Sequence, residues 1–149
     1  METKLFGGFS PNEKLSSIPE SMFTKLFPLI DHLGELKVTL YALWFISRQE
    51  GSLLHLRFHH FLKDKELMAG LDDSAEYLLE SLNKAIQRGS LLCYIPRDKT
   101  LKDGIFFINS AKGRAAFNGL QQGAWSADDE NLPIITTPII RPNIFSLYE

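Results

Sequence analysis

One segment of the chain, Glu35–Arg48, is apolar around the whole circumference of the helix that its spacing predicts. A helix of this kind cannot lie on a surface with one face in water, so other elements must cover it on several sides. We therefore expect this helix to form the centre of the core, with Trp44 as a core residue. The chain has 149 residues, of which 44% are hydrophobic, and this suits one globular domain that buries about two thirds of its unfolded surface.

The residues before this helix predict an extended arm and a first helix. Residues 1–16 hold turn formers without a sustained period, and Phe6 and Phe9 are their only large anchors. Ser17 and Glu20 have the spacing of a capping box, which predicts a helix over 17–30. Its expected buried face is made of Phe23, Leu26, Phe27 and Ile30.

Three further elements follow the central helix. Partial alternation over Leu53–Phe58 predicts a short strand, and a helix is predicted over His60–Ala69. Another helix is expected to open with a cap at Asp73 and to end at Gly89. Its expected buried stripe is Leu78, Leu79, Leu82, Ala85 and Ile86, and its expected outward residues are Asp73, Glu76, Tyr77, Glu80, Lys84 and Gln87.

The second half of the chain predicts a hairpin, a helix and a linker. Strand-forming runs at 91–95 and 105–109 are joined by a long tip over 96–104, and Ser110 is placed to cap a helix through Leu120. Residues 123–149 contain three prolines and are predicted to be a linker. The fold class is therefore α+β, mainly α. The element order is that of a winged helix-turn-helix over 17–122, with an extra N-terminal helix and a C-terminal helix after the wing.

The sequence also resembles a known family. Ser17–Arg48 (SIPESMFTKLFPLIDHLGELKVTLYALWFISR) and Phe106–Trp125 (FFINSAKGRAAFNGLQQGAW) resemble the N-terminal winged-helix domain of the DnaD-like replication initiation proteins. Arg141–Glu149 (RPNIFSLYE) resembles the opening of the second, helical module of that family, whose remainder the resemblance places outside this chain. The resemblance implies a role in primosome assembly. It implies self-association and contacts with DNA and with other replication initiation proteins or a helicase loader.

Charge is distributed unevenly along the chain. The net charge is −2, but the segment from Arg88 to Arg114 carries six basic and two acidic side chains, whereas residues 11–87 carry eight basic and eleven acidic ones. Basic side chains bind phosphates without regard to base sequence. The candidate DNA-binding residues are Lys84, Arg88, Arg97, Lys99, Lys102, Lys112 and Arg114. A solvated surface loop is the alternative interpretation of this cluster, and Asp98 and Asp103 within the tip weaken the DNA interpretation.

The expected recognition helix is acidic where it begins. Asp72, Asp73, Glu76 and Glu80 favour the helix N-terminus through its dipole but repel phosphate, so sequence-specific base reading is disfavoured. The first interpretation is a replication module that self-associates, with Phe6 and Phe9 as contacts, and binds DNA weakly. The alternatives are a winged-helix transcription regulator and a protein–protein adaptor without DNA contact.

Other classes of function find little support in the residues. His55, His59 and His60 lack a cysteine or carboxylate spaced to complete a metal site, and the sequence has no glycine-rich phosphate loop, nucleophile elbow or HExxH motif. We expect no enzyme, no cofactor and no metal. The single cysteine, Cys93, and the lack of a long apolar run predict a cytoplasmic protein without a membrane span. Trp125 is expected to dock either on the domain or on a partner.

Overall fold

The structure is a computed structural model and describes residues 4–49, 54–128 and 132–135. About half of the chain is helical and the rest includes a small antiparallel sheet, so the predicted α+β class is confirmed. The elements in chain order are η1 (Met22–Leu26), η2 (Phe27–Leu29), α1 (Leu33–Ser47), β1 (Leu56–Arg57), α2 (Phe58–Leu62), α3 (Lys65–Ala69), α4 (Ala75–Arg88), β2 (Leu91–Tyr94), η3 (Leu101–Asp103), β3 (Ile105–Ile108), α5 (Ala111–Gln121), β4 (Trp125–Asp128) and β5 (Leu132–Ile135).

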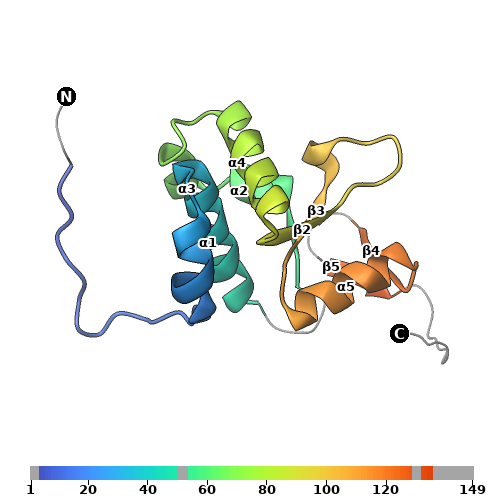
Figure 1. The fold of residues 1–149 in the computed structure, drawn as a ribbon, viewed down its shortest axis with the longest axis horizontal. Helices are drawn as coiled ribbons and strands as arrows, with labels where there is room; N and C mark the ends of the chain where they lie inside the picture. Colours follow the sequence, from blue (N-terminus) through green and yellow to red (C-terminus); the bar gives the residue numbers. More distant parts are fainter. Residues whose placement is uncertain (1–3, 50–53, 129–131, 136–149) are drawn as a thin grey trace.

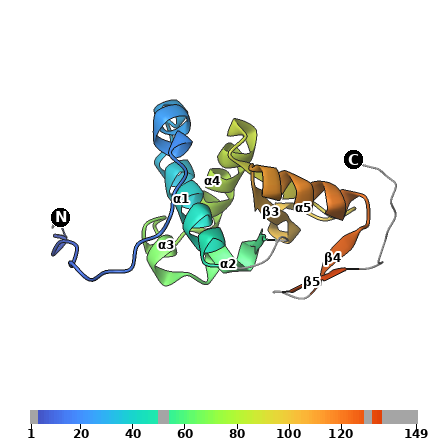
Figure 2. The same ribbon diagram turned by 90° about the horizontal axis from the view of Figure 1, so that it is seen from below.

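A three-stranded antiparallel sheet of order β1-β3-β2 divides the core into two parts. Side chains alternate between the two faces of a strand, so neighbours on β3 point to opposite sides. Phe106 packs in a cluster with α1 and α4, whereas Ile105 and Phe107 pack with α5 and Trp125. Figures 1 and 2 show α1 and α4 side by side on one side of the sheet and α5 on the other.

The predicted hairpin and its flanking helices are confirmed. Strands β2 and β3 pair from Leu91↔Ile108 to Tyr94↔Ile105, close to the expected boundaries. Helix α4 ends at Gly89, whose φ of 95° lies in the left-handed region that glycine adopts without strain. Helix α5 is capped by Ser110, whose hydroxyl accepts a hydrogen bond from the backbone N–H of Gly113 at 3.1 Å.

Helix α1 occupies the core centre, as predicted, but not every apolar side chain on it is core. Val38 and Ala42 are fully buried, and Leu82 of α4 is buried beside them. Trp44 and Leu40 are only partly buried and line a surface groove. The prediction that Trp44 is a core residue is therefore wrong, because α3 covers this side of α1 incompletely.

The predicted helix over 17–30 is wrong in its extent and in its buried face. Ser17 is exposed, and helical structure begins at Met22 as a π-helical turn followed by a 3-10 turn. Pro28 lies within the second turn and has no N–H, so an α-helix cannot continue through it. The aromatic rings of Phe23 and Phe27 are about half exposed, and Met22 is the buried residue.

Residues 58–74 are divided more finely than predicted. Phe58 begins α2 and does not extend the strand, and the expected helix over 60–69 is interrupted. Asp64 causes the interruption, because its side chain accepts from the N–H of Leu67 at 2.9 Å and caps α3. The cap of α4 is Ser74, which accepts from the N–H of Tyr77 at 3.0 Å, and not Asp73 as predicted.

The region after Gly123 is not wholly a linker. Strands β4 and β5 pair antiparallel from Trp125↔Ile135 to Asp128↔Leu132, which corrects the linker prediction for these residues. The Trp125 ring docks on its own domain, where it is 3% exposed and its Nε1–H donates to the Ala116 carbonyl at 2.8 Å. Residues 129–131 and 136–149 of the predicted linker lie outside the described residues.

Candidate nucleic-acid interface

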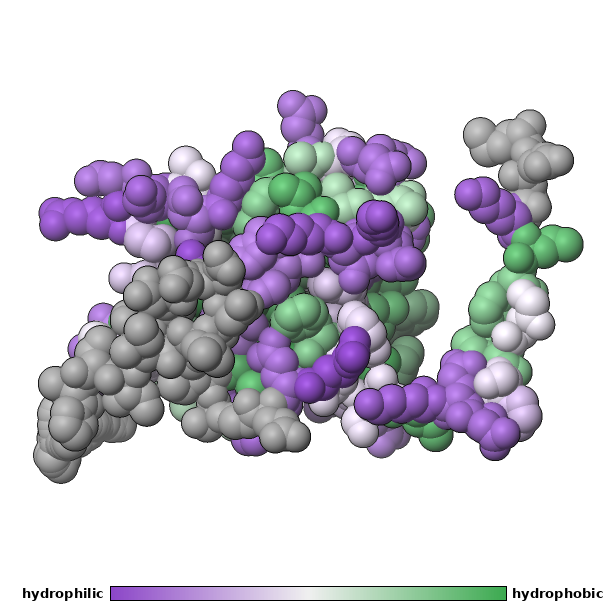
Figure 3. Space-filling view, turned by 180° about the vertical axis from the view of Figure 1, so that it is seen from behind, coloured by the Kyte–Doolittle hydropathy of each residue, from purple (hydrophilic) through white to green (hydrophobic). Residues whose placement is uncertain are grey.

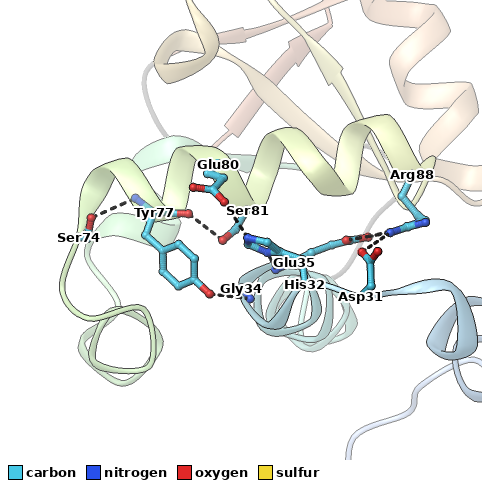
Figure 4. A network of polar contacts seen from close by, with 9 residues as sticks. All are labelled: Asp31, His32, Gly34, Glu35, Ser74, Tyr77, Glu80, Ser81 and Arg88. Carbon is cyan, nitrogen blue, oxygen red and sulfur yellow. Dashed lines mark hydrogen bonds and ion pairs between the residues drawn. The ribbon is translucent and has the colours of Figure 1, made fainter.

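A polar network fixes the start of α1 against α4 (Figure 4). The Gly34 backbone N–H donates to the Tyr77 hydroxyl at 3.1 Å, and the Ser81 hydroxyl donates to the Tyr77 carbonyl at 2.7 Å. His32 caps α1 by accepting from the N–H of Glu35 at 3.0 Å, and its other ring nitrogen lies 2.9 Å from Glu80 Oε2. The prediction that Tyr77 faces outward is therefore wrong, since its hydroxyl serves the α1 N-terminus.

Arg88 belongs to the same network. Its Nε donates to Glu35 Oε2 at 2.9 Å and its Nη2 donates to Asp31 Oδ1 at 3.1 Å. Glu35 is fully buried, so its carboxylate needs a cationic partner. The hydrogen bond to Glu35 is the main cause that raises the pKa of Arg88. Arg88, a candidate for binding phosphate on sequence grounds, is thus engaged by two carboxylates.

The N-terminal end of α4 is acidic in space as well as in sequence. Asp72 and Asp73 are exposed and have left-handed φ values of 58° and 52°, a conformation that aspartate tolerates better than most residues. Glu76 in the first turn and Glu80 one turn later are also exposed. Phosphates brought to this end of α4 would meet four carboxylates.

The connection between β2 and β3 carries three exposed cations. We call Arg97, Lys99 and Lys102 the tip group. The Lys99 N–H donates to the Pro96 carbonyl at 3.1 Å, which closes a turn at the end of β2. Asp103 accepts from the Thr100 N–H at 3.2 Å and caps η3, so this carboxylate has a local structural role.

Three of the other predicted DNA-binding residues follow or precede, within a few positions, the end of the hairpin where Leu91 pairs with Ile108: these are Arg88, Lys112 and Arg114. Lys84 lies one turn before Arg88 on α4. We call Lys84, Arg88, Lys112 and Arg114 the base group. Arg114 Nη1 donates to Asn109 Oδ1 at 3.0 Å, and Asn109 Nδ2 donates to the Gly89 carbonyl at 2.7 Å. These bonds join the start of α5 to the end of α4. The four residues of β3, about 13 Å long, separate the base group from the tip group.

Sequence reasoning missed a cavity at the base end. It has a volume of about 460 Å³, and Lys25 and Arg88 line it beside apolar side chains of η1 and α1. The hydroxyls of Thr39 and Ser90 also line it and have no hydrogen-bond partner within the described part of the chain. The sequence carries no signal for this cavity, because its walls come from segments far apart in the chain.

The histidines pack against aromatic rings. His55 is 4% exposed, and its ring centroid lies 5.7 Å from Trp125 and 6.4 Å from Phe107. The rings of His59 and His60 lie 4.3 Å apart. Among the described residues no three histidine, cysteine, aspartate or glutamate side chains gather as a metal site would require.

Phe6 and Phe9 lie in the arm. Their rings contact each other edge to face with centroids 4.9 Å apart, and both side chains are more than 70% exposed. Residues 4–17, which we call the arm, are exposed throughout.

Comparisons of the chain with protein-family models, with curated proteins and with solved structures found no match. The resemblance to the DnaD-like proteins therefore rests on the residues alone. No helix in the described residues is both long enough and apolar enough to span a bilayer.

Proposed function

We propose that the protein is a DNA-associated winged-helix module of the DnaD-like, replication-initiation kind. In this proposal β2 and β3 form the wing, and the tip group contacts phosphates. The observation that carries the proposal is the β2–β3 connection. Its three cations are exposed, and the Asp103 carboxylate accepts a hydrogen bond from the Thr100 N–H. Contacts of this kind give affinity that depends on salt and not on base sequence.

The surroundings of α4 support sequence-independent binding. A helix that reads bases presents the side chains near its N-terminus to the major groove. Here that end carries Asp72, Asp73 and Glu76, while Tyr77 is held by Gly34. A winged-helix transcription regulator is the weaker alternative for this reason.

The remaining parts of the proposal follow from the resemblance and from the arm. The protein self-associates through Phe6 and Phe9 and meets other replication initiation proteins or a helicase loader. It acts in the cytoplasm, without catalysis and without a cofactor. A protein–protein adaptor without DNA contact is the second candidate, and the exposed apolar side chains of the arm favour it.

Fluorescence anisotropy with labelled duplexes of unrelated sequences tests the proposal. We expect dissociation constants in the range of about 10⁻⁴–10⁻⁶ M at physiological salt, equal for all sequences. Replacing the tip group by alanine should weaken binding and lower the slope of log K against log salt by about 0.9 for each phosphate that the variant no longer neutralises. The matched control removes the same charge from exposed lysines elsewhere, with Lys14→Ala, Lys63→Ala and Lys65→Ala.

Each result decides between the candidates. Binding that survives removal of the tip group but is abolished in Lys112→Ala, Arg114→Ala places the interface at the base group. If the protein binds no duplex, the DNA-associated function is excluded and the protein–protein adaptor remains as the candidate function. Tight binding to one sequence that disappears on changing Glu80 makes α4 a reader of bases and the protein a regulator. Under the proposal, Asp73→Asn with Glu76→Gln leaves binding equal or slightly tighter, because repulsion is removed.

A further inference from the structure

The cavity at the base end has the size and the lining of a small-molecule site. Its volume of about 460 Å³ lies within the range of such sites, and it is partly open to solvent. Protein interiors are otherwise close-packed, with few voids larger than a water molecule. The apolar side chains in its walls come from η1, η2, α1 and β3, and they are Met22, Leu26, Leu29, Leu43 and Ile108.

Two hydroxyl groups at this cavity lack a hydrogen-bond partner. Thr39 on α1 and Ser90 between α4 and β2 both line the cavity, and neither side-chain oxygen bonds to another group in the described part of the chain. Thr39 is 2% exposed, and a buried hydroxyl without a partner costs stability. Each hydroxyl turns by rotation about one Cα–Cβ bond, and threonine in a helix occupies either of two rotamers. A ligand in the cavity can therefore supply the partner that the protein does not.

The charged residues at the cavity do not favour an anionic ligand. Arg88 already donates to Glu35 and to Asp31, so two carboxylates balance its charge. Lys25 also lines the cavity but is exposed, and an ion pair with an exposed lysine contributes little in water. The groups that await a partner are two neutral hydroxyls, which favour a neutral ligand.

Water is a poor occupant of this space. A buried water makes about three hydrogen bonds, and two other polar residues in the walls are already engaged. The Asn109 side chain donates to the Gly89 carbonyl and accepts from Arg114, and the Ser110 hydroxyl accepts from the Gly113 N–H. An apolar group that displaces poorly ordered water from such walls gains affinity.

The arm does not fill the cavity in this structure. Pro19 and Ser21, which follow the arm in the chain, are among the walls. Figure 3 shows the arm itself standing clear of the body of the molecule. The walls are therefore accessible to a molecule that comes from outside the chain.

We propose that this cavity binds a small neutral molecule that has an apolar body and a hydroxyl group. The body lies against Met22, Leu43 and Ile108, and the hydroxyl pairs with Thr39 and Ser90, since a hydroxyl can donate to one group and accept from another. The ligand joins η1 to the base of the β2–β3 hairpin. The inference does not depend on the proposed DNA contacts, because the tip group lies on the connection at the other end of the hairpin.

Amide NMR spectra of the full chain, titrated with benzyl alcohol, test where a ligand of this class binds. We expect saturable shifts that are largest at the amides of the lining residues, including Met22, Thr39 and Ser90. Benzoate, which replaces the hydroxyl by a charge, should bind more weakly. Shifts that do not saturate, shifts that instead centre on Trp44 in the α1–α3 groove, or tighter binding of benzoate would each overturn the proposal.

Removing one hydroxyl tests how the ligand is recognised. Thr39→Val keeps the shape of the side chain, and it should raise the dissociation constant of benzyl alcohol about fivefold. It should leave that of toluene, which has no hydroxyl, equal or lower. Because the Thr39 hydroxyl has no partner within the described part of the chain, the unfolding midpoint should stay equal or rise.

A matched control makes the loss specific. Thr24→Val is the same change at an exposed threonine of η1 outside the cavity walls, and it should bind benzyl alcohol as the wild type does. Ser90→Ala should show the same pattern as Thr39→Val and serves as the second variant if Thr39→Val does not fold. Unchanged affinity for benzyl alcohol in the folded variants, or equal weakening of both probes, overturns the proposal.

Discussion

Replacing Gly34 by alanine tests how tightly α1 and α4 are joined. Alanine is the better helix former by about 1 kcal/mol, so propensity alone predicts a more stable protein. The structure predicts the opposite, because a Cβ at Gly34 would overlap the Ser81 hydroxyl and lie 2.9 Å from Cζ of Tyr77. Ser81 is fully buried and donates to the Tyr77 carbonyl, so it cannot move without breaking that bond.

The expected cost follows from these contacts. Overpacking of this kind costs about 1–3 kcal/mol, and a broken hydrogen bond about 1 kcal/mol, against a gain of about 1 kcal/mol from propensity. We expect Gly34→Ala to lower the free energy of unfolding by about 1–3 kcal/mol. For a chain of this size that corresponds to a fall in Tm of roughly 2–12 °C, measured by calorimetry or circular dichroism.

Two further variants make the test specific. Gly70→Ala is the milder control, since a Cβ there would lie 3.2 Å from Lys37 Nζ and 3.3 Å from the Leu67 carbonyl oxygen, gaps that shifts of a few tenths of an ångström relieve, and φ is −75°. It should leave Tm equal or slightly raise it. Ser81→Ala removes the overlapping oxygen, so Gly34→Ala with Ser81→Ala should be more stable than Gly34→Ala alone. A Gly34→Ala chain as stable as the wild type would refute the close packing of α1 on α4.

Three other changes have defined outcomes. Gly113→Ala should destabilise by about 3 kcal/mol or more in chemical denaturation, because its Cβ would overlap the backbone carbonyl oxygen of Ile108, which cannot rotate away. Burial raises the pKa of the Cys93 thiol to about 12, so at pH 8 the folded chain should react with a thiol-specific reagent far more slowly than the chain unfolded in guanidinium chloride; equal rates would place the thiol in water. Trp125→Phe should cost about 1–2 kcal/mol, since the Ala116 carbonyl loses its buried donor, and an unchanged unfolding midpoint would mean that Trp125 does not dock on α5.

The sequence predicts an element correctly where residues within that element determine its structure. The apolar stripe of α4, with Leu78, Leu82 and Ala85 buried, follows from helical periodicity. The Gly89 stop and the Ser110 cap follow from backbone chemistry that needs no knowledge of neighbouring elements. The β2–β3 hairpin was predicted for the same reason, since two strand-forming runs close together in the chain pair with each other.

Sequence reasoning failed where a distant partner decides the outcome. Tyr77 is polar at its tip and was expected to face water, but the Gly34 N–H is its partner from another helix. The periodic phenylalanines Phe23 and Phe27 suggested a buried face, yet Pro28 ends regular helix there and Met22 takes the buried position. The partner of Tyr77 lies on another helix, whereas Pro28 lies next to Phe27 and is a signal within the segment itself.

At the candidate site, too, the sequence identified local features but not contacts between distant segments. The basic residues were identified from the sequence, but their separation into two groups was not, because closeness in the chain was taken as closeness in space. Lys102 and Lys112 are separated by a strand that carries them to opposite ends of the sheet. The pairing of Arg88 with Glu35 was also not predicted, because a buried carboxylate was not expected in this apolar helix.

These contacts restrict what α4 can do. One face of the helix is buried in the core through Leu78 and Leu82, and a second is joined to the start of α1 through Tyr77, Ser81 and Arg88. The N-terminal part of the remaining face is acidic. A helix used in this way serves as a support, and the surfaces left for partners lie on the segments that it holds in place. These are the β2–β3 tip, with its exposed cations, and the α1–α3 groove, with its apolar walls, so the two surfaces differ in chemistry.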